Sequence, residues 1–116
     1  MADYTIYHNP RCSKSRQTLA LLEENGIEPA VVLYLNEPPS ATELKAIIKK
    51  LGIAARDLLR NKEADYKALN LSNADLDDSA LIAAMVKHPK LIERPIVIKS
   101  NNAVLGRPPE NVLTLL

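Results

Sequence analysis

Apolar and polar positions along the chain fall into short runs that switch between the period of a strand and the period of a helix. Residues 4–8 predict a strand, and residues 13–25 predict a helix that ends at Gly26. Residues 30–35 are rich in β-branched and apolar side chains, which favours a second strand buried on both faces. A strand, a helix and a strand in this order predict a parallel pair with a right-handed crossover.

The middle of the chain carries helical patterns. Ser40, followed three residues later by Glu43, matches a capping box and predicts a helix that ends at Gly52. Further helices are predicted at residues 56–60, at residues 64–69, and from Asp77 to Lys87.

The last third of the chain predicts a hairpin and a helix. Residues 96–99 and 103–105 are expected to pair as antiparallel strands around a turn at residues 100–102, because asparagine tolerates a positive φ. Pro108 suits the first turn of a final helix. The order of elements predicts one α/β domain over residues 1–116, with a mixed four-stranded sheet flanked by helices and a helical insert after strand two, at about residues 40–80.

Composition narrows the class of protein. A net charge of +1 and an aromatic content of 3% argue against a nucleic-acid partner and against an acidic membrane surface. Apolar runs are too short to span a bilayer, and the segment that starts at Met1 lacks the pattern of a secretion signal. A single cysteine cannot form an internal disulfide, which fits a reducing compartment. We therefore expect a cytoplasmic protein.

That cysteine, Cys12, is predicted to lie where the first strand ends and the first helix begins. Amide N–H groups at a helix N-terminus lack internal partners and carry partial positive charge, which stabilises a thiolate. Arg11, Lys14 and Arg16 add positive charge nearby, and a protonated His8 would add more. A buried, inert cysteine is the alternative. The basic and polar surroundings favour a reactive thiol with a lowered pKa.

Three arginines lie beside predicted element boundaries, namely Arg60, Arg94 and Arg107. Guanidinium groups bind tetrahedral oxyanions through paired hydrogen bonds. Each arginine taken alone fits a solvated surface charge, and spacing alone does not bring the three together. His8 could orient the thiol, or it could simply be a hydrogen-bonded histidine at a strand end. One cysteine and two histidines form no metal-binding pattern, so no metal site is predicted.

Residues 7–16 resemble the active-site motif of glutaredoxin-dependent arsenate reductases. Three later segments, residues 58–60, 88–97 and 106–108, resemble the same family, so the match covers essentially the whole chain. The Asn-Pro-Arg-Cys-Ser-Lys-Ser sequence of residues 9–15 resembles an arsenate-reductase-like subgroup, because better-known members carry Gly-Thr in place of Ser13-Lys14. The resemblance implies a thioredoxin-like fold and a cis peptide bond between Arg94 and Pro95.

The resemblance also implies a mechanism without a bound cofactor. Cys12 would attack arsenate to give a thioester of arsenic. Glutathione as co-substrate would then displace the arsenic as arsenite, and glutaredoxin would reduce the mixed disulfide. Arg60, Arg94 and Arg107 would hold the oxyanion. His8, Ser15 and Arg16 would stabilise the thiolate.

Two other functions remain open at this stage. The fold also resembles Spx-type regulators that bind RNA polymerase, but those usually carry a second cysteine where this chain has Ser15. A general thiol oxidoreductase acting on glutathione mixed disulfides is the second alternative. The absence of a second cysteine and the three arginines favour the arsenate reductase.

Overall fold

The structure, a computed structural model, describes residues 3–116. Residues 1 and 2, with which the prediction of no secretion signal begins, lie outside the described residues. The chain divides into two compact units. Unit 1 comprises Met1–Glu37 and Arg94–Leu116, and unit 2 comprises Pro38–Glu93. The organisation as one domain with a helical insert at about residues 40–80 stays a prediction.

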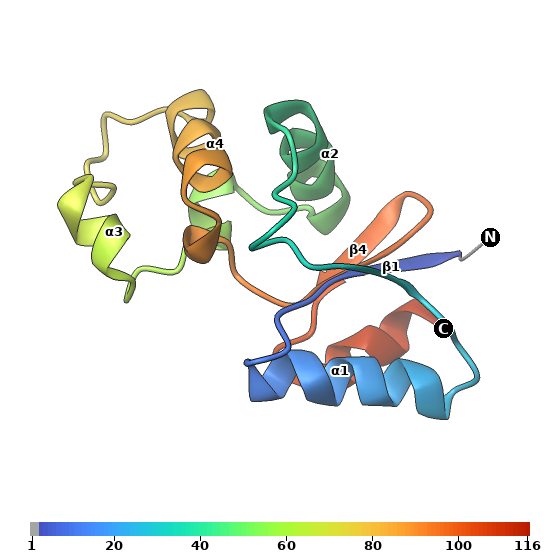
Figure 1. Ribbon diagram of the computed structural model, residues 1–116. Coiled ribbons are helices and arrows are strands. Elements are labelled where there is room, and N and C mark those ends of the chain that lie inside the picture. Colours follow the sequence, from blue (N-terminus) through green and yellow to red (C-terminus); the bar gives the residue numbers. More distant parts are fainter. Residues whose placement is uncertain (1–2) are drawn as a thin grey trace. The chain divides into compact units, whose positions relative to one another are not determined.

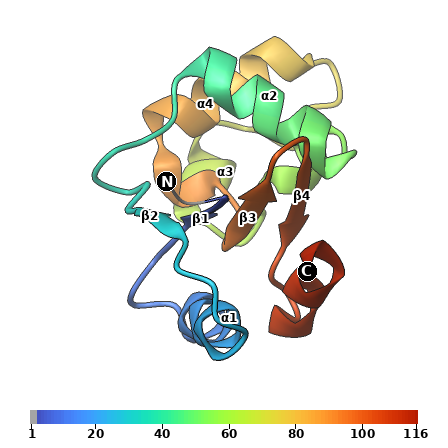
Figure 2. The same cartoon turned by 90° about the vertical axis from the view of Figure 1, so that its right-hand side faces the viewer.

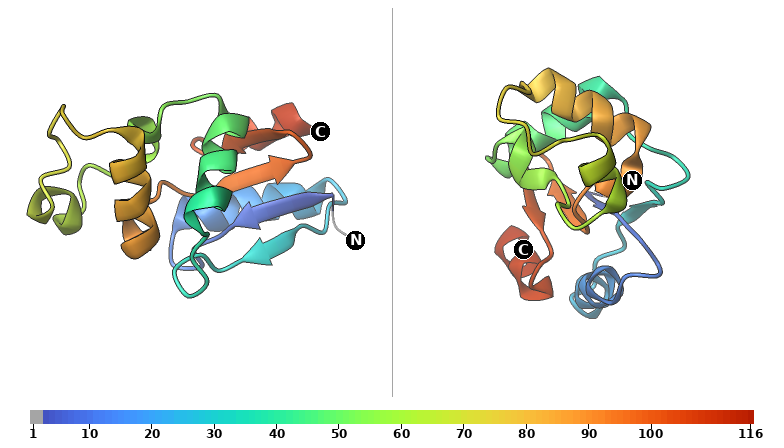
Figure 3. Two further views of the ribbon diagram at one scale, coloured as in Figure 1. Left: turned by 90° about the horizontal axis from the view of Figure 1, so that it is seen from above. Right: turned by 90° about the vertical axis from the view of Figure 1, so that its left-hand side faces the viewer.

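Unit 1 contains the sheet. Its strands within residues 3–116 are β1 (Tyr4–Tyr7), β2 (Ala30–Val32), β3 (Ile96–Lys99) and β4 (Asn102–Leu105), in the order β2-β1-β3-β4 (Figure 3). β1 pairs with β2 in parallel and with β3 in antiparallel orientation, and β3 and β4 form an antiparallel hairpin. The predicted parallel pair, the predicted hairpin and the mixed four-stranded sheet are confirmed.

Two helices of unit 1, α1 (Ser13–Glu24) and the 3₁₀-helix η3 (Pro109–Leu115), lie side by side on one face of this sheet (Figures 1 and 2). Alternate residues of a strand share a face, so the strands supply every second side chain to the core beneath them. The buried cluster consists of Tyr4, Ile6, Leu22, Val97, Val112 and Leu115. This core fixes α1 against β1, and it thereby fixes the short loop that joins them.

The prediction for the second strand is wrong in length and in burial. β2 has three residues instead of six, and Val31, Leu33 and Leu35 are 47%, 39% and 38% exposed. The physical reason is the strand order, since β2 lies at an edge of the sheet and has β1 as its neighbour. The carbonyl of Leu33 accepts hydrogen bonds from the backbone N–H groups of Asn36 and Glu37, so the chain turns away directly after the strand.

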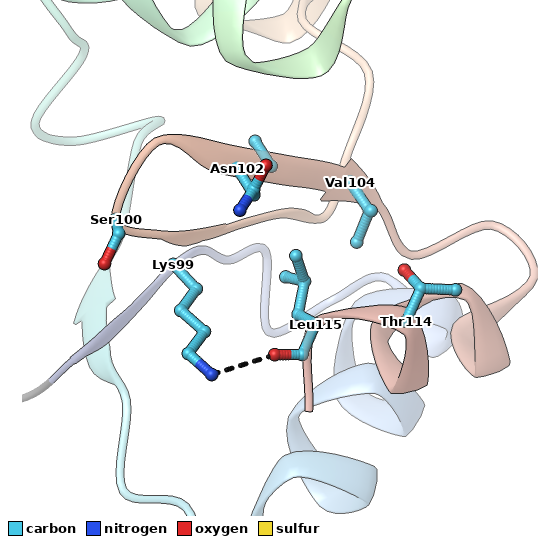
Figure 4. Close-up of a pocket in the computed structure, with 7 residues that line it drawn as sticks. Lys99, Ser100, Asn102, Val104, Thr114 and Leu115 are labelled. Carbon is cyan, nitrogen blue, oxygen red and sulfur yellow. Dashed lines mark hydrogen bonds between the residues drawn. The ribbon is translucent and has the colours of Figure 1, made fainter.

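The C-terminal helix is held by two donors from the sheet. Lys99 Nζ donates to the carbonyl oxygen of Leu115 at 3.1 Å (Figure 4). Tyr4 Oη donates to the same oxygen at 3.1 Å, and the Lys99 ammonium lies 5.2 Å from the centre of the Tyr4 ring. A cavity of about 410 Å³ adjoins these groups. The hairpin turn differs from expectation, because the positive φ of 55° falls on Ser100 and not on an asparagine.

Unit 2 is helical. Its elements are α2 (Ala41–Leu51), the 3₁₀-helix η1 (Ala55–Leu58), α3 (Ala64–Ala68), α4 (Asp78–Lys87) and the 3₁₀-helix η2 (Pro89–Leu91), and α2 and α4 lie side by side (Figure 1). The predicted capping box is confirmed, since Ser40 Oγ accepts from the Glu43 N–H at 3.1 Å and the Glu43 carboxylate accepts from the Ser40 N–H. Over residues 3–116, none of the helices is both long enough and apolar enough for a membrane span.

Candidate active site

Cys12 is the N-cap residue of α1, directly after the loop that follows β1. Its backbone N–H donates to the Asn9 carbonyl at 3.0 Å, and its own carbonyl accepts from the Arg16 N–H at 3.0 Å in the first helical turn. The residue is 9% exposed. The predicted position at a strand-to-helix junction is confirmed.

Burial of the Cys12 thiol raises its pKa, and four groups act against burial. The backbone N–H of Ser15 and the charge of Arg94 lower the pKa, and the backbone N–H of Lys14 and the charge of Arg107 lower it further. Cys12 makes no side-chain capping hydrogen bond, yet these nearby amides still favour an anionic sulfur. The outcome is a pKa below the ordinary value of the thiol.

The two arginines reach Cys12 from the far end of unit 1. Arg107 Nη1 lies 4.0 Å from Cys12 Sγ and donates to the Arg94 carbonyl oxygen at 3.5 Å. The Nε of Arg94 is buried. The predicted cis bond between Arg94 and Pro95 is confirmed, and the bond between Arg107 and Pro108 is cis as well, which the sequence did not indicate.

His8 and Ser15 form a buried polar pair behind the Cys12 loop. His8 Nδ1 and Ser15 Oγ share a hydrogen bond of 2.6 Å, and the Asn9 backbone N–H donates to the same Oγ at 3.0 Å. Burial lowers the pKa of His8, and the charge of Arg16 lowers it further. Both effects favour the neutral imidazole over the protonated form that would add positive charge. The pair instead fixes the loop that carries the thiol.

The remaining predicted site residues have other contacts. Arg16 Nη1 donates to the Pro10 carbonyl at 2.8 Å, which ties α1 to the preceding loop. Arg60 belongs to unit 2, where its Nη1 contacts the Glu63 carboxylate at 2.6 Å and its Nε lies 3.9 Å from the Glu93 carboxylate. The roles of Arg16 at the thiolate and of Arg60 at an oxyanion stay predictions.

Sequence reasoning missed Thr18 and Gly106, which support the site from behind. Thr18 is fully buried on α1, and its Oγ1 donates to the carbonyls of Lys14 at 2.8 Å and Gly106 at 3.3 Å. The Gly106 N–H donates to the Pro95 carbonyl at 2.9 Å. Together these bonds join α1 to the segments that carry Arg94 and Arg107. The sequence did contain a signal for a buried helix face, because Ser15, Thr18 and Leu22 have helical spacing. Ser15 and Thr18 are not apolar, so the pattern did not predict burial.

Replacing Gly106 with alanine is expected to destabilise unit 1. The added Cβ would lie 2.8 Å from Pro95 Cγ and 2.9 Å from Thr18 Cγ2, closer than such atoms pack. Overpacking of this kind costs about 1–3 kcal/mol, measurable by urea unfolding. Combining Gly106→Ala with Thr18→Ala should cost less than the two single changes added together, because one of the obstructing side chains is gone. Simple additivity would contradict the close-packing explanation.

The Cys12 thiol is expected to titrate below pH 8.5, the ordinary midpoint of a free cysteine. Because the shift is downward, the thiolate and its reaction with iodoacetamide should persist as pH falls through 8.5, and should be lost only at the lowered midpoint. The ultraviolet absorbance of the thiolate would follow the same titration. Arg107→Gln should move the midpoint upward. A wild-type midpoint at or above 8.5 would contradict the electrostatic account.

A cavity of about 340 Å³ lies beside the Cys12 loop. It is lined by His8, Asn9, Pro10, Arg11, Leu33, Leu35 and Asn36. Among residues 3–116, no group of three or more histidine, cysteine, aspartate or glutamate side chains could hold a metal ion. The reactive groups of unit 1 are therefore the Cys12 thiol, whose pKa is lowered, and the guanidinium groups of Arg94 and Arg107.

A family model described as "ArsC family" matches residues 7–115. The chain belongs to the ArsC family. The predicted family is thereby confirmed, and the match covers both the Cys12 loop and the segments that carry the arginines.

Individual proteins are similar to this chain over nearly their whole length. The chain is 58% identical over 112 residues to a protein of Escherichia coli K12 named "Uncharacterized protein YfgD", covering 96% of this chain and 94% of that protein. It is 55% identical over 112 residues to a Haemophilus influenzae protein named "Arsenate reductase", covering 96% and 97%. A solved structure named "Arsenate reductase from Vibrio cholerae" matches with a TM-score of 0.96 at 56% identity, covering 97% of each chain. The predicted thioredoxin-like α/β fold class is confirmed.

Proposed function

We propose that this protein is an arsenate reductase in which Cys12 is the nucleophile and glutathione and glutaredoxin supply the electrons. The observation that carries the proposal is the contact of 4.0 Å between Arg107 Nη1 and Cys12 Sγ, with the Arg94 charge acting on the same sulfur. A thiolate repels an arsenate anion, and two guanidinium groups beside it offset that repulsion. Relatives at more than half identity carry the name arsenate reductase.

In the first step, the Cys12 thiolate attacks arsenic(V). A bond forms between Sγ and arsenic, and one arsenate oxygen leaves as water after taking up two protons. Arg94 and Arg107 hold the remaining oxygens through their N–H groups, and we propose Arg60 as a further oxyanion-binding residue. Guanidinium groups suit this task because they donate in pairs to tetrahedral anions.

In the second step, glutathione thiolate attacks Cys12 Sγ. A sulfur–sulfur bond forms, the sulfur–arsenic bond breaks, and its electron pair stays on arsenic, which leaves as arsenic(III) in arsenite. Glutaredoxin then attacks the mixed disulfide at the glutathione sulfur and releases the Cys12 thiolate. The outside thiols are needed because Cys12 is the single cysteine in the chain.

The other site residues prepare the nucleophile. The bond between His8 and Ser15 fixes the loop that positions Cys12, and Arg16 fixes the start of α1 to that loop. We place all three as residues that stabilise the thiolate. Reduced glutathione and a single free thiol both fit the cytoplasm, and the reaction needs no bound cofactor.

A coupled assay tests the function. Arsenate, glutathione, glutaredoxin, glutathione reductase and NADPH are mixed with the protein, NADPH loss is followed, and arsenite is measured directly. Arsenite formation that requires both thiol components supports the proposal. A general thiol oxidoreductase would instead turn over a glutathionylated peptide and form no arsenite above background, which would contradict it.

A further inference from the structure

We propose that the cavity of about 340 Å³ beside the Cys12 loop is the binding site for the glutathione tripeptide. This inference rests on the proposed function, which requires an outside thiol to reach Cys12. The cavity is lined by two segments, the loop His8–Arg11 after β1 and the turn Leu33–Asn36 after β2. Both segments belong to unit 1.

The cavity wall is continuous with the nucleophile. The loop His8–Arg11 leads directly into Cys12, whose backbone N–H is bonded to the Asn9 carbonyl. The same loop is held from behind by Ser15 Oγ, which accepts from the Asn9 N–H and bonds to His8. A ligand against this wall therefore lies against a segment whose position relative to Cys12 is fixed.

The sheet order separates this cavity from the arginines. β2 lies on one side of β1, and β3 and β4 lie on the other. Arg94 precedes β3 and Arg107 follows β4, whereas Leu33 and Leu35 follow β2. A thiolate that displaces arsenic from Cys12 Sγ must attack opposite the breaking bond. With the oxyanion held beside Arg94 and Arg107, we place the incoming thiol on the side of β2.

The lining fits a small anionic peptide. Leu33 and Leu35 are more than a third exposed and offer apolar surface, and Asn9 and Asn36 offer amide groups. Arg11 is the cation among the lining residues, and none of them is acidic. Glutathione carries two carboxylates and one ammonium, so its net charge of about −1 at neutral pH complements this wall. The cavity volume falls at the lower end of small-molecule sites, roughly 300–1,000 Å³.

A binding experiment tests the site without arsenate. The probe is S-methylglutathione, which keeps the tripeptide and cannot form a disulfide. Titration into the wild-type protein should shift the backbone amide NMR signals of His8, Asn9 and Arg11 and of residues 33–36 in a saturable way. Leu35→Glu should remove these shifts, because it places a carboxylate where the ligand carries its own. Leu113→Glu is the matched control, since Leu113 on η3 is 43% exposed against 38% for Leu35.

Kinetics give a second readout. Leu35→Glu should raise the KM for glutathione roughly 10-fold, the change expected from about 1.4 kcal/mol of lost binding, and should leave the KM for arsenate unchanged. Leu113→Glu should change neither value. Equal effects of the two variants, or shifts confined to residues outside the cavity, would overturn the assignment. If S-methylglutathione binds at these residues but the protein forms no arsenite, the glutathione site is supported and arsenate reduction alone is rejected.

Discussion

Cys12→Ser is expected to lower arsenite formation about 10³-fold or more, to the background rate of the thiol mixture. A serine hydroxyl is a slightly smaller replacement that is not ionised near neutral pH, so the amides and arginines that stabilise an anionic sulfur have no anion to act on. The protein also loses the sulfur that forms the disulfide with glutathione. The measurement is arsenite produced per enzyme in the coupled assay.

The control for this variant is Ser13→Ala, an exposed neighbour at the same helix end. It should keep wild-type turnover, and both variants should keep the wild-type midpoint of thermal unfolding within a few degrees. Arsenite formation by Cys12→Ser at a rate near that of Ser13→Ala would remove Cys12 from the mechanism, whatever its pKa.

The elements that the sequence predicted well are those set by close neighbours along the chain. The Ser40 and Glu43 bonds, the left-handed Gly26 and Gly52, and the place of Cys12 at the start of α1 all follow from residues within one helical turn. A cap is satisfied or left open locally, so its sequence pattern carries most of the information. The sequence could therefore locate Cys12 at the start of α1.

Features that depend on strand order could not be predicted from residues close together in the sequence. The apolar run from Ala30 to Leu35 looks like a central strand, yet β2 lies at the edge because β3 takes the other side of β1. The same order brings Arg94 and Arg107 to Cys12 from the far end of the chain. Only the resemblance to a family indicated that convergence. The exposed Leu33 and Leu35, unexplained by a buried strand, become the wall of a cavity instead.

The protonation of His8 depends on its burial, which could not be predicted from the sequence. Beside Arg11, Lys14 and Arg16, the imidazole would add positive charge if it were protonated. The structure buries it against Ser15, and this burial together with the Arg16 charge lowers its pKa. The positive charge acting on the Cys12 thiolate therefore comes from Arg94 and Arg107.

Charge and hydrogen-bond geometry make separate contributions at Arg94. Its positive charge lowers the pKa of Cys12, and a lysine would keep that contribution. Its planar guanidinium can also donate two parallel hydrogen bonds to a tetrahedral oxyanion, whereas a lysine ammonium acts as a single point charge. A substitution that preserves charge and removes the fork tells these contributions apart.

Arg94→Lys is expected to lower kcat/KM for arsenate about 10²-fold, the scale of losing one donor to a developing oxyanion, while the Cys12 titration midpoint stays near the wild-type value. Arg94→Gln should lose activity and also raise that midpoint, because the charge is gone. Arg56→Lys is the matched control, since Arg56 donates to the Leu71 and Asn73 carbonyls within unit 2, and it should keep kcat/KM. Full activity in Arg94→Lys would mean that charge alone suffices and that arsenate is not held by a guanidinium fork at this position.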